Sequence, residues 1–237
     1  MKKRNQGWYY MPLVLVLFLL MIGCSKKSED NPIPDPGTVT DIDGNVYHTI
    51  TIGTQMWLVE NLKTTKYNDG SAIPMVTDNA AWVYLSTPGY CWYNNNVNYK
   101  NTYGALYNWY AVNTGKLAPT GWNVATDADW TILTKYLGGD SIAGGKMKST
   151  GTIEASTGLW YSPNTGATNS SGFTAVPAGY RDHGVFGGIG VEGVWWSTTE
   201  GGFYGAWCRD LGCGGNNVHI GNATESHGYS VRCVLDL

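Results

Sequence analysis

The chain has 237 residues and a formal net charge of −3, from 15 Lys and Arg against 18 Asp and Glu. This balance gives no electrostatic reason to expect a nucleic-acid partner, because proteins that bind nucleic acids gather positive charge on one surface. Hydrophobic residues make up 43% of the chain, enough for a packed core, and 11 Trp, 16 Tyr and 32 Gly favour a β-dominated domain with half-buried rings and many turns.

The N-terminus has the features of a secretory signal peptide, which we place at residues 1–23. Lys2, Lys3 and Arg4 form a basic region, and an apolar run (MPLVLVLFLLMIG) follows over residues 11–23. This run is shorter than the ~20 residues that a membrane-spanning helix needs. It also ends in a small residue, as cleaved signals do.

Cys24 directly follows the apolar run, and the stretch MIGC at residues 21–24 resembles a bacterial lipobox, in which the cysteine is acylated before the signal is cut. Several acyl chains on one cysteine hold a protein durably on a membrane. We therefore predict lipidation at Cys24. The alternatives are an ordinary signal peptide with a chance cysteine, or an uncleaved anchor.

Residues 24–37 are predicted to form a flexible tether, because the stretch SKKSEDNPIPDPG after Cys24 is polar and contains three prolines. Ser25, in place of Asp, favours the bacterial outer membrane by the sorting rule known for some bacteria. The acidic pair Glu29 and Asp30 beside lysines resembles a signal for export to the outer face. We expect a lipid-anchored, surface-exposed protein whose folded domain spans residues 38–237.

The first predicted element of the domain is a β-hairpin. Apolar and polar residues alternate over residues 46–52, a second apolar run covers residues 56–59, and a Gly-containing turn separates them.

Two helices are predicted in the middle of the chain. The first covers residues 104–112 (GALYNWYAV) and is closed by Gly115. The second begins after Thr126, which can form a capping box with Asp129, and Gly138 and Gly139 end it. Acidic residues in that first turn favour the helix end electrostatically, so we do not assign them an acid/base role.

Short strands between glycine-rich loops are predicted from residue 146 onward, at residues 173–176, 194–198, 204–211, 217–220 and 229–234. Trp195 and Trp196 are adjacent within one of these strands, so their rings point to opposite faces. A strand with a large ring on each face fits a position between two packed layers. We therefore predict that these rings and Trp207 belong to the core and do not form an exposed binding platform.

Seven sequence blocks resemble, in order, the Fibrobacter succinogenes major paralogous domain family from about residue 39 to 237: DIDGNVYHTITIGTQMWLVENL, YGALYNWYAV, LAPTGWNVATDADWTIL, LGGDSIAGGKMK, GATNSSGFTAVPAGYRD, WWSTTE and GYSVRCV. That family looks like a relative of the C-type lectin-like fold and of formylglycine-generating-type domains. The resemblance implies an α+β fold, with two helices flanking a small twisted antiparallel β-sheet and long Gly-rich loops.

Four cysteines follow the tether, and an even number in an oxidising compartment allows two disulfides in three connectivities. Cys208 and Cys213 are close enough in sequence to close a small loop, which would leave Cys91 to pair with Cys233. The family commonly has a further cysteine where this chain has Ala118. That cysteine would be expected to bridge to Cys233.

Ligand contacts are predicted on the loops, because binding residues usually lie on loops over a rigid scaffold. The candidates are Arg181, Asp182, His183, Glu192, Glu200, Asn216 and His227. No histidine pair has helical metal-ligand spacing and no Cys-x-x-Cys is present in the sequence, so we predict no metal centre and no cofactor. Loop carboxylates of Asp182, Glu192, Glu200 and Asp210 could gather Ca²⁺, although the lectin-type calcium motif is missing from the sequence.

Two classes of function compete for this domain. The first, which we favour, is a non-catalytic binding or adhesion module that recognises an extracellular glycan or protein. The second is an enzyme on a formylglycine-generating-like scaffold, for which the sequence offers no nucleophile, metal or cofactor motif. A structural surface component without a discrete ligand lies close to the first class.

Overall fold

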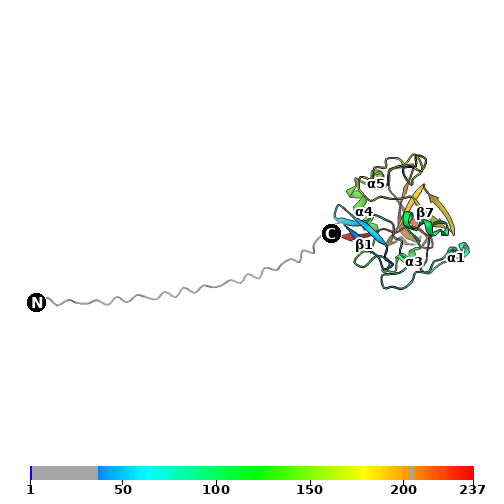
Figure 1. The fold of residues 1–237 in the computed structure, drawn as a ribbon, viewed down its shortest axis with the longest axis horizontal. Helices are drawn as coiled ribbons and strands as arrows, with labels where there is room; N and C mark the ends of the chain where they lie inside the picture. The colour runs from blue at the N-terminus through cyan, green and yellow to red at the C-terminus, as the bar shows by residue number, and fades with distance from the viewer. Residues whose placement is uncertain (2–36, 203–204) are drawn as a thin grey trace. The chain divides into compact units, whose positions relative to one another are not determined.

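The computed structural model of the chain describes Met1, residues 37–202 and residues 205–237. The signal peptide, Cys24 and the tether lie outside the described domain and stay predictions. Within the described residues the chain forms three β-sheets and five α-helices, and only two of these helices are longer than five residues (Figure 1).

The first sheet holds the N-terminal and C-terminal strands of the domain. Its order is β1-β2-β3-β12-β6, and every neighbouring pair is antiparallel. The strands are β1 (Thr38–Thr40), β2 (Val46–Ile52), β3 (Gln55–Leu58), β6 (Asn123–Val124) and β12 (Cys233–Asp236). The predicted hairpin is confirmed as β2 and β3, with Gly53 at a positive φ of 65° in the turn.

The second sheet is built from the C-terminal third of the chain, in the order β11-β10-β9-β7-β8. Its strands are β7 (Ala178–Asp182), β8 (Val185–Ile189), β9 (Glu192–Glu200), β10 (Ala206–Gly212) and β11 (His219–Ala223). The strands β7 and β9 touch in parallel at Gly179 and Gly193, and the other pairs are antiparallel. A small third sheet pairs β4 (Tyr90–Cys91) with β5 (Leu106–Tyr107).

The helices are mostly short: α1 (Asn79–Val83), α2 (Lys100–Tyr103), α3 (Trp109–Val112), α4 (Asp127–Tyr136) and α5 (Asp140–Met147), with 3-10 turns at Tyr93–Asn95 and Val97–Tyr99. The predicted capping box of α4 is confirmed, since Thr126 and Asp129 bond to each other's backbone N–H groups. The predicted helix over residues 104–112 is only half right. Leu106 and Tyr107 pair as a strand with β4, and the helix begins at Trp109.

The expected C-type lectin-like α+β fold is wrong, because the described domain is mostly β. The two longer helices do not flank one sheet. Trp130 and Leu133 of α4 and Ala143 and Met147 of α5 join a single core with Trp57 and Trp195. Short apolar runs between many glycines can complete strands but cannot supply the long apolar stripe that a flanking helix needs.

The strand β9 lies between two cores, as its sequence predicts. Trp196 and Val194 pack in one core with Tyr107, whereas Trp195 packs in the other. Both rings have no exposed surface, which confirms the core interpretation for them, and Trp207 is half-buried. The expected strand at residues 173–176 is reduced to one bridge between Ala175 and Lys148.

The predicted disulfides are wrong, because all four cysteines of the described domain are free. Cys208 belongs to the core that contains Trp196, whereas Cys213 packs against the core on the other side of the sheet. Cys91 lies in a third core with Trp82, separate from that of Cys233. Burial raises the pKa of the Cys91 thiol to about 12. The packing therefore keeps the thiols apart, and burial keeps the Cys91 thiol protonated at neutral pH.

Candidate functional site

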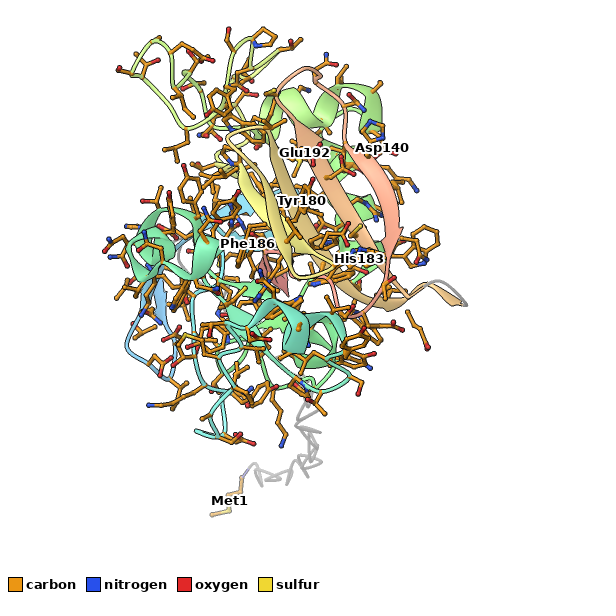
Figure 2. The ribbon with its side chains drawn as sticks, turned by 90° about the vertical axis from the view of Figure 1, so that its right-hand side faces the viewer. Met1, Asp140, Tyr180, His183, Phe186 and Glu192 are labelled. Carbon is orange, nitrogen blue, oxygen red and sulfur yellow. The ribbon has the colours of Figure 1, made fainter. Side chains whose placement is uncertain are left out.

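A groove of about 310 Å³ lies on one face of the second sheet. It is lined by carboxylate and phenol side chains, a small apolar floor and residues of β11: Tyr180, Asp182, Glu192, Val194, Cys208, Asp210, Gly221, Asn222, Ala223 and Tyr229. Figure 2 shows Tyr180 and Glu192 on this sheet and His183 at the turn end of the β7–β8 hairpin. The groove is therefore built on strands as well as on loops.

Strand alternation explains why these side chains share a face. Residues two apart in a strand point the same way, so Cys208 and Asp210 of β10 lie beside Val194 of β9, with which Asp210 is in register. Gly221 stands opposite Cys208 on β11, and a Cβ placed there would come within 2.9 Å of Cys208 Sγ. The missing side chain leaves room above the sheet.

The carboxylates of the groove are partly withdrawn from water. Burial raises the pKa of Glu192, and the neighbouring Asp210 raises it further. Burial also raises the pKa of Asp210, against the opposite effect of His219. The groove thus offers carboxyl groups whose hydrogen bonds to a ligand would form in a partly dry setting, where such bonds are stronger.

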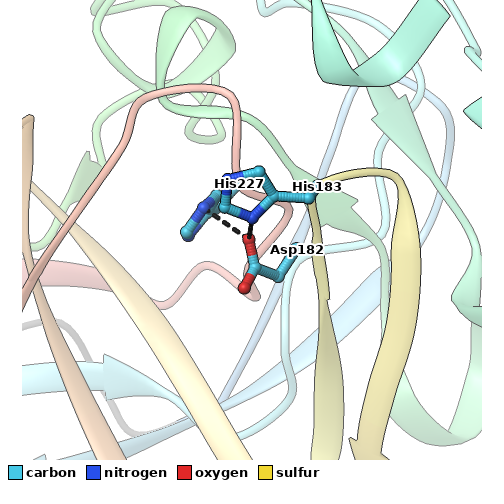
Figure 3. Close-up of side chains that lie close together, drawn as sticks. All are labelled: Asp182, His183 and His227. Carbon is cyan, nitrogen blue, oxygen red and sulfur yellow. Dashed lines mark ion pairs between the residues drawn. The ribbon is translucent and has the colours of Figure 1, made fainter. Parts of the chain in front are cut away.

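Asp182, His183 and His227 form a compact cluster at the end of the groove (Figure 3). Asp182 Oδ1 lies 2.6 Å from His227 Nε2 and also contacts His183 Nδ1. His227 Nδ1 lies 3.0 Å from the Tyr229 hydroxyl. Burial lowers the pKa of His227, although Asp182 raises it. Among the described residues, these three form the group of His, Cys, Asp and Glu side chains that lie close enough together to hold a metal ion.

Four of the seven predicted ligand residues come together at this site: Asp182, His183, Glu192 and His227. Glu200 is exposed at the far end of β9, and Asn216 lies against α5, where its carbonyl accepts a hydrogen bond from Gly145. Neither lines the groove.

Arg181 is misassigned as a loop contact, because its side chain has no exposed surface. Its guanidinium donates to Val76 O, at 2.7 Å, and to Asn79 Oδ1, at 2.8 Å. It also stacks over the Trp82 ring, with its Cζ 4.4 Å from the centroid. Arg181 therefore anchors β7 to the α1 segment from beneath the groove.

Sequence reasoning missed Tyr180 and Tyr229 as lining residues. The sequence signal that could have identified them is the polar hydroxyl that each carries among residues of the core. The histidine cluster was missed because His227 is far from His183 in the sequence. A hydrogen-bonded bridge between Arg181 and Gly228 brings the two segments together.

Replacing Asp210 with Asn should raise the melting temperature at pH 7. The raised pKa means that the folded state favours the protonated carboxyl. The associated stability is present below the unfolded pKa, near 3.8, and is lost as the pH rises through the folded value. The gain from Asp210→Asn should therefore be largest at neutral pH and vanish near pH 3.8 in thermal unfolding followed by circular dichroism.

Asp69→Asn is the control with the opposite sign. Hydrogen bonds from Ser71 and Lys116 lower the pKa of this exposed carboxyl. Its removal should slightly lower stability at pH 7, and the loss should disappear in acid. A fall in melting temperature for Asp210→Asn at pH 7 would contradict the assignment of a partly buried carboxylate to the groove.

Comparison with known families gives one match. The model of the Fibrobacter succinogenes major domain matches residues 50–235, which is most of the chain. No significant match was found among curated proteins or among solved structures. Among the described residues, no helix has the length and apolar character to cross a membrane.

Proposed function

The chain belongs to the Fibrobacter succinogenes major domain family, and we propose that it is a lipid-anchored surface protein whose domain binds an extracellular glycan in the groove of the second sheet. The groove is the observation that carries this proposal. It combines carboxyl groups and phenols on a sheet whose opposite face packs against a buried core.

The lining of the groove suits a polyhydroxylated ligand. Glu192 and Asp210 can accept hydrogen bonds from sugar hydroxyls. Tyr180 and Tyr229 supply flat apolar faces with a polar end, against which a sugar ring can pack. A volume of about 310 Å³ is at the lower end of the range for small-ligand pockets, about 300–1,000 Å³. A groove of this volume can hold a few sugar rings but is too small to accommodate the surface of a folded protein partner.

Thiol-based catalysis is less favoured by the same groove. Cys208 is the cysteine that lines it, and burial raises the pKa of this thiol to about 12. The reactive form of cysteine is the thiolate, which is scarce at neutral pH when the pKa is this high. Binding without turnover is the chemistry that the described lining supports best.

The binding test compares two glutamates of one strand. The full chain, purified in detergent, is applied to arrays of glycans and of extracellular proteins. Glu192→Gln, inside the groove, should weaken glycan binding about tenfold, the effect of losing one charge-assisted hydrogen bond. Glu200→Gln is the same substitution on the exposed end of β9 and should leave binding unchanged.

Two results would count against the groove. One is equal binding by the Glu192→Gln and Glu200→Gln proteins, which would place the contact elsewhere. The other is binding to proteins alone, which would replace the glycan by a protein partner. If the chain bound nothing on either array, a structural role in the surface layer would be favoured.

Lipidation is tested separately, at Cys24. Cys24→Ser should remove all incorporation of labelled fatty acid and release the protein from the membrane fraction, because the acyl chains provide the anchor. Wild-type chain and Cys208→Ser, which changes a buried cysteine of the domain, serve as the controls. Fatty-acid label that persists in Cys24→Ser would contradict the anchor.

A further inference from the structure

We propose that Asp182, His183 and His227 bind a divalent transition-metal ion of the Zn²⁺ class at the turn of the β7–β8 hairpin. This proposal goes beyond glycan binding and stands independently of it. It rests on three observations: the distances between the donor atoms, the way the backbone holds them, and the hydrogen bonds that the donor atoms lack.

The donor atoms have the spacing of a metal site that needs only a small adjustment. Asp182 Oδ1, His183 Nδ1 and His227 Nε2 all lie within 4.8 Å of one another. Ligand bonds of about 2.0–2.2 Å in a tetrahedral Zn²⁺ site place neighbouring donor atoms roughly 3.3–3.6 Å apart. The 2.6 Å between Asp182 Oδ1 and His227 Nε2 would therefore have to open by about 1 Å. The side chains of His183 and Asp182 are 77% and 42% exposed, so they can make this movement.

Backbone hydrogen bonds and a tight turn fix the positions of the three residues. Asp182 and Val185 pair across the hairpin, so His183 and Gly184 form a two-residue turn, with positive φ values of 46° and 77°. Two-residue hairpin turns of this type require positive φ at both positions. On the other side, Arg181 and Gly228 exchange backbone hydrogen bonds of 2.9 and 2.7 Å. This bridge sets His227 beside Asp182.

The hydrogen bonds that are missing point to a shared cation. Asp182 Oδ1 and His227 Nε2 are both buried, and neither has a hydrogen-bond partner of acceptable geometry among the described residues. The other ring nitrogen of His227 is occupied by the Tyr229 hydroxyl, as in metal-bound histidines, whose second nitrogen is usually hydrogen-bonded. A lone pair on Nε2 facing a carboxylate oxygen is stable only with a proton or a cation between them.

The donor set selects the class of ion. Two imidazoles and one carboxylate suit Zn²⁺ and similar transition metals, whereas Ca²⁺ prefers six to eight oxygen ligands. Three protein ligands leave at least one coordination position for water or for a ligand atom. Asp182 also lines the groove, so an ion held there would add a positive charge at the end of an otherwise acidic surface.

Zn²⁺ titration by calorimetry tests the site. The full chain in detergent, stripped with a chelator, should bind one Zn²⁺ at the cluster of Asp182, His183 and His227, and Zn²⁺ should raise its melting temperature. His183→Ala changes an exposed side chain and should fold normally but lose at least about tenfold in affinity. His227→Ala should show the same loss.

His48→Ala is the matched control. His48 forms a histidine–carboxylate contact of 2.6 Å with Glu60, without a third donor. Its removal should leave Zn²⁺ affinity unchanged. Equal affinity in wild type, His183→Ala and His227→Ala, or no Zn²⁺ binding by the wild-type chain, would overturn the proposal and reduce the cluster to an ion pair. No glycan is present in this experiment, so either result leaves the groove test unaffected.

Discussion

Trp196→Ala should lower the free energy of unfolding by about 3–5 kcal/mol, the usual loss when a packed Trp becomes Ala. The ring has no exposed surface and lies 4.5 Å, between centroids, from that of Tyr229. Its Nε1 donates to Tyr107 O at 2.8 Å. The substitution leaves a cavity and also removes one of the two donors to that carbonyl, which keeps the hydrogen bond from the Tyr229 N–H at 3.0 Å. Urea unfolding followed by fluorescence measures the loss.

Trp207→Ala is the control on the neighbouring strand. This ring is half-buried, so its removal should cost clearly less than that of Trp196. Trp196→Phe should recover part of the stability, because it keeps an aromatic ring in the core. If Trp196→Ala kept wild-type stability and lost only ligand binding, the ring would be part of a binding platform and the core interpretation would be wrong.

Arg232→Met should destabilise the domain by a similar amount, about 3–5 kcal/mol, because several buried acceptors lose a hydrogen bond at about 1–3 kcal/mol each. The guanidinium is fully buried and donates to four oxygens: Asn61 Oδ1 and Leu58 O at 2.7 Å, Phe173 O at 2.9 Å and Thr174 O at 3.1 Å. Burial lowers the pKa of Arg232 to about 9. Met fills the volume but supplies no donors, so the carbonyls of Leu58, Phe173 and Thr174 would lose these hydrogen bonds, whereas Asn61 Oδ1 would keep the one from Trp195 Nε1 at 2.8 Å.

Arg232 also holds Phe173 and Thr174 in place outside a sheet, because its side chain donates to both of their carbonyls, and Thr174 has a positive φ of 54° that a regular strand does not allow. Arg232→Lys should lose less than Arg232→Met, because one ammonium can satisfy part of the set. Lys135→Met, on an exposed position of α4, should change stability by about 0.5 kcal/mol or less. Equal stability of all three proteins would contradict the network.

The sequence alone determined the features whose causes lie within a few residues. The Thr126 and Asp129 capping box fixed the start of α4, and alternation fixed the β2–β3 hairpin and the burial of Trp195 and Trp196 on opposite faces. Each of these depends on contacts between near neighbours or on the geometry of one strand. Such local causes act whatever the rest of the chain does.

Composition already favoured a β-dominated domain, but only the tertiary structure decided the arrangement of the sheets, the state of the cysteines and the site. The pairing of Arg181 with Gly228 sets His227 against Asp182, and the order of β7, β9 and β10 places Tyr180, Glu192 and Asp210 on one groove. The charge of Arg181 predicts an exposed side chain, yet its guanidinium is buried and donates hydrogen bonds to the carbonyls of Val76 and Thr77. These contacts join segments far apart in the chain, and their partners are chosen by the packing of the whole domain, which no local pattern encodes.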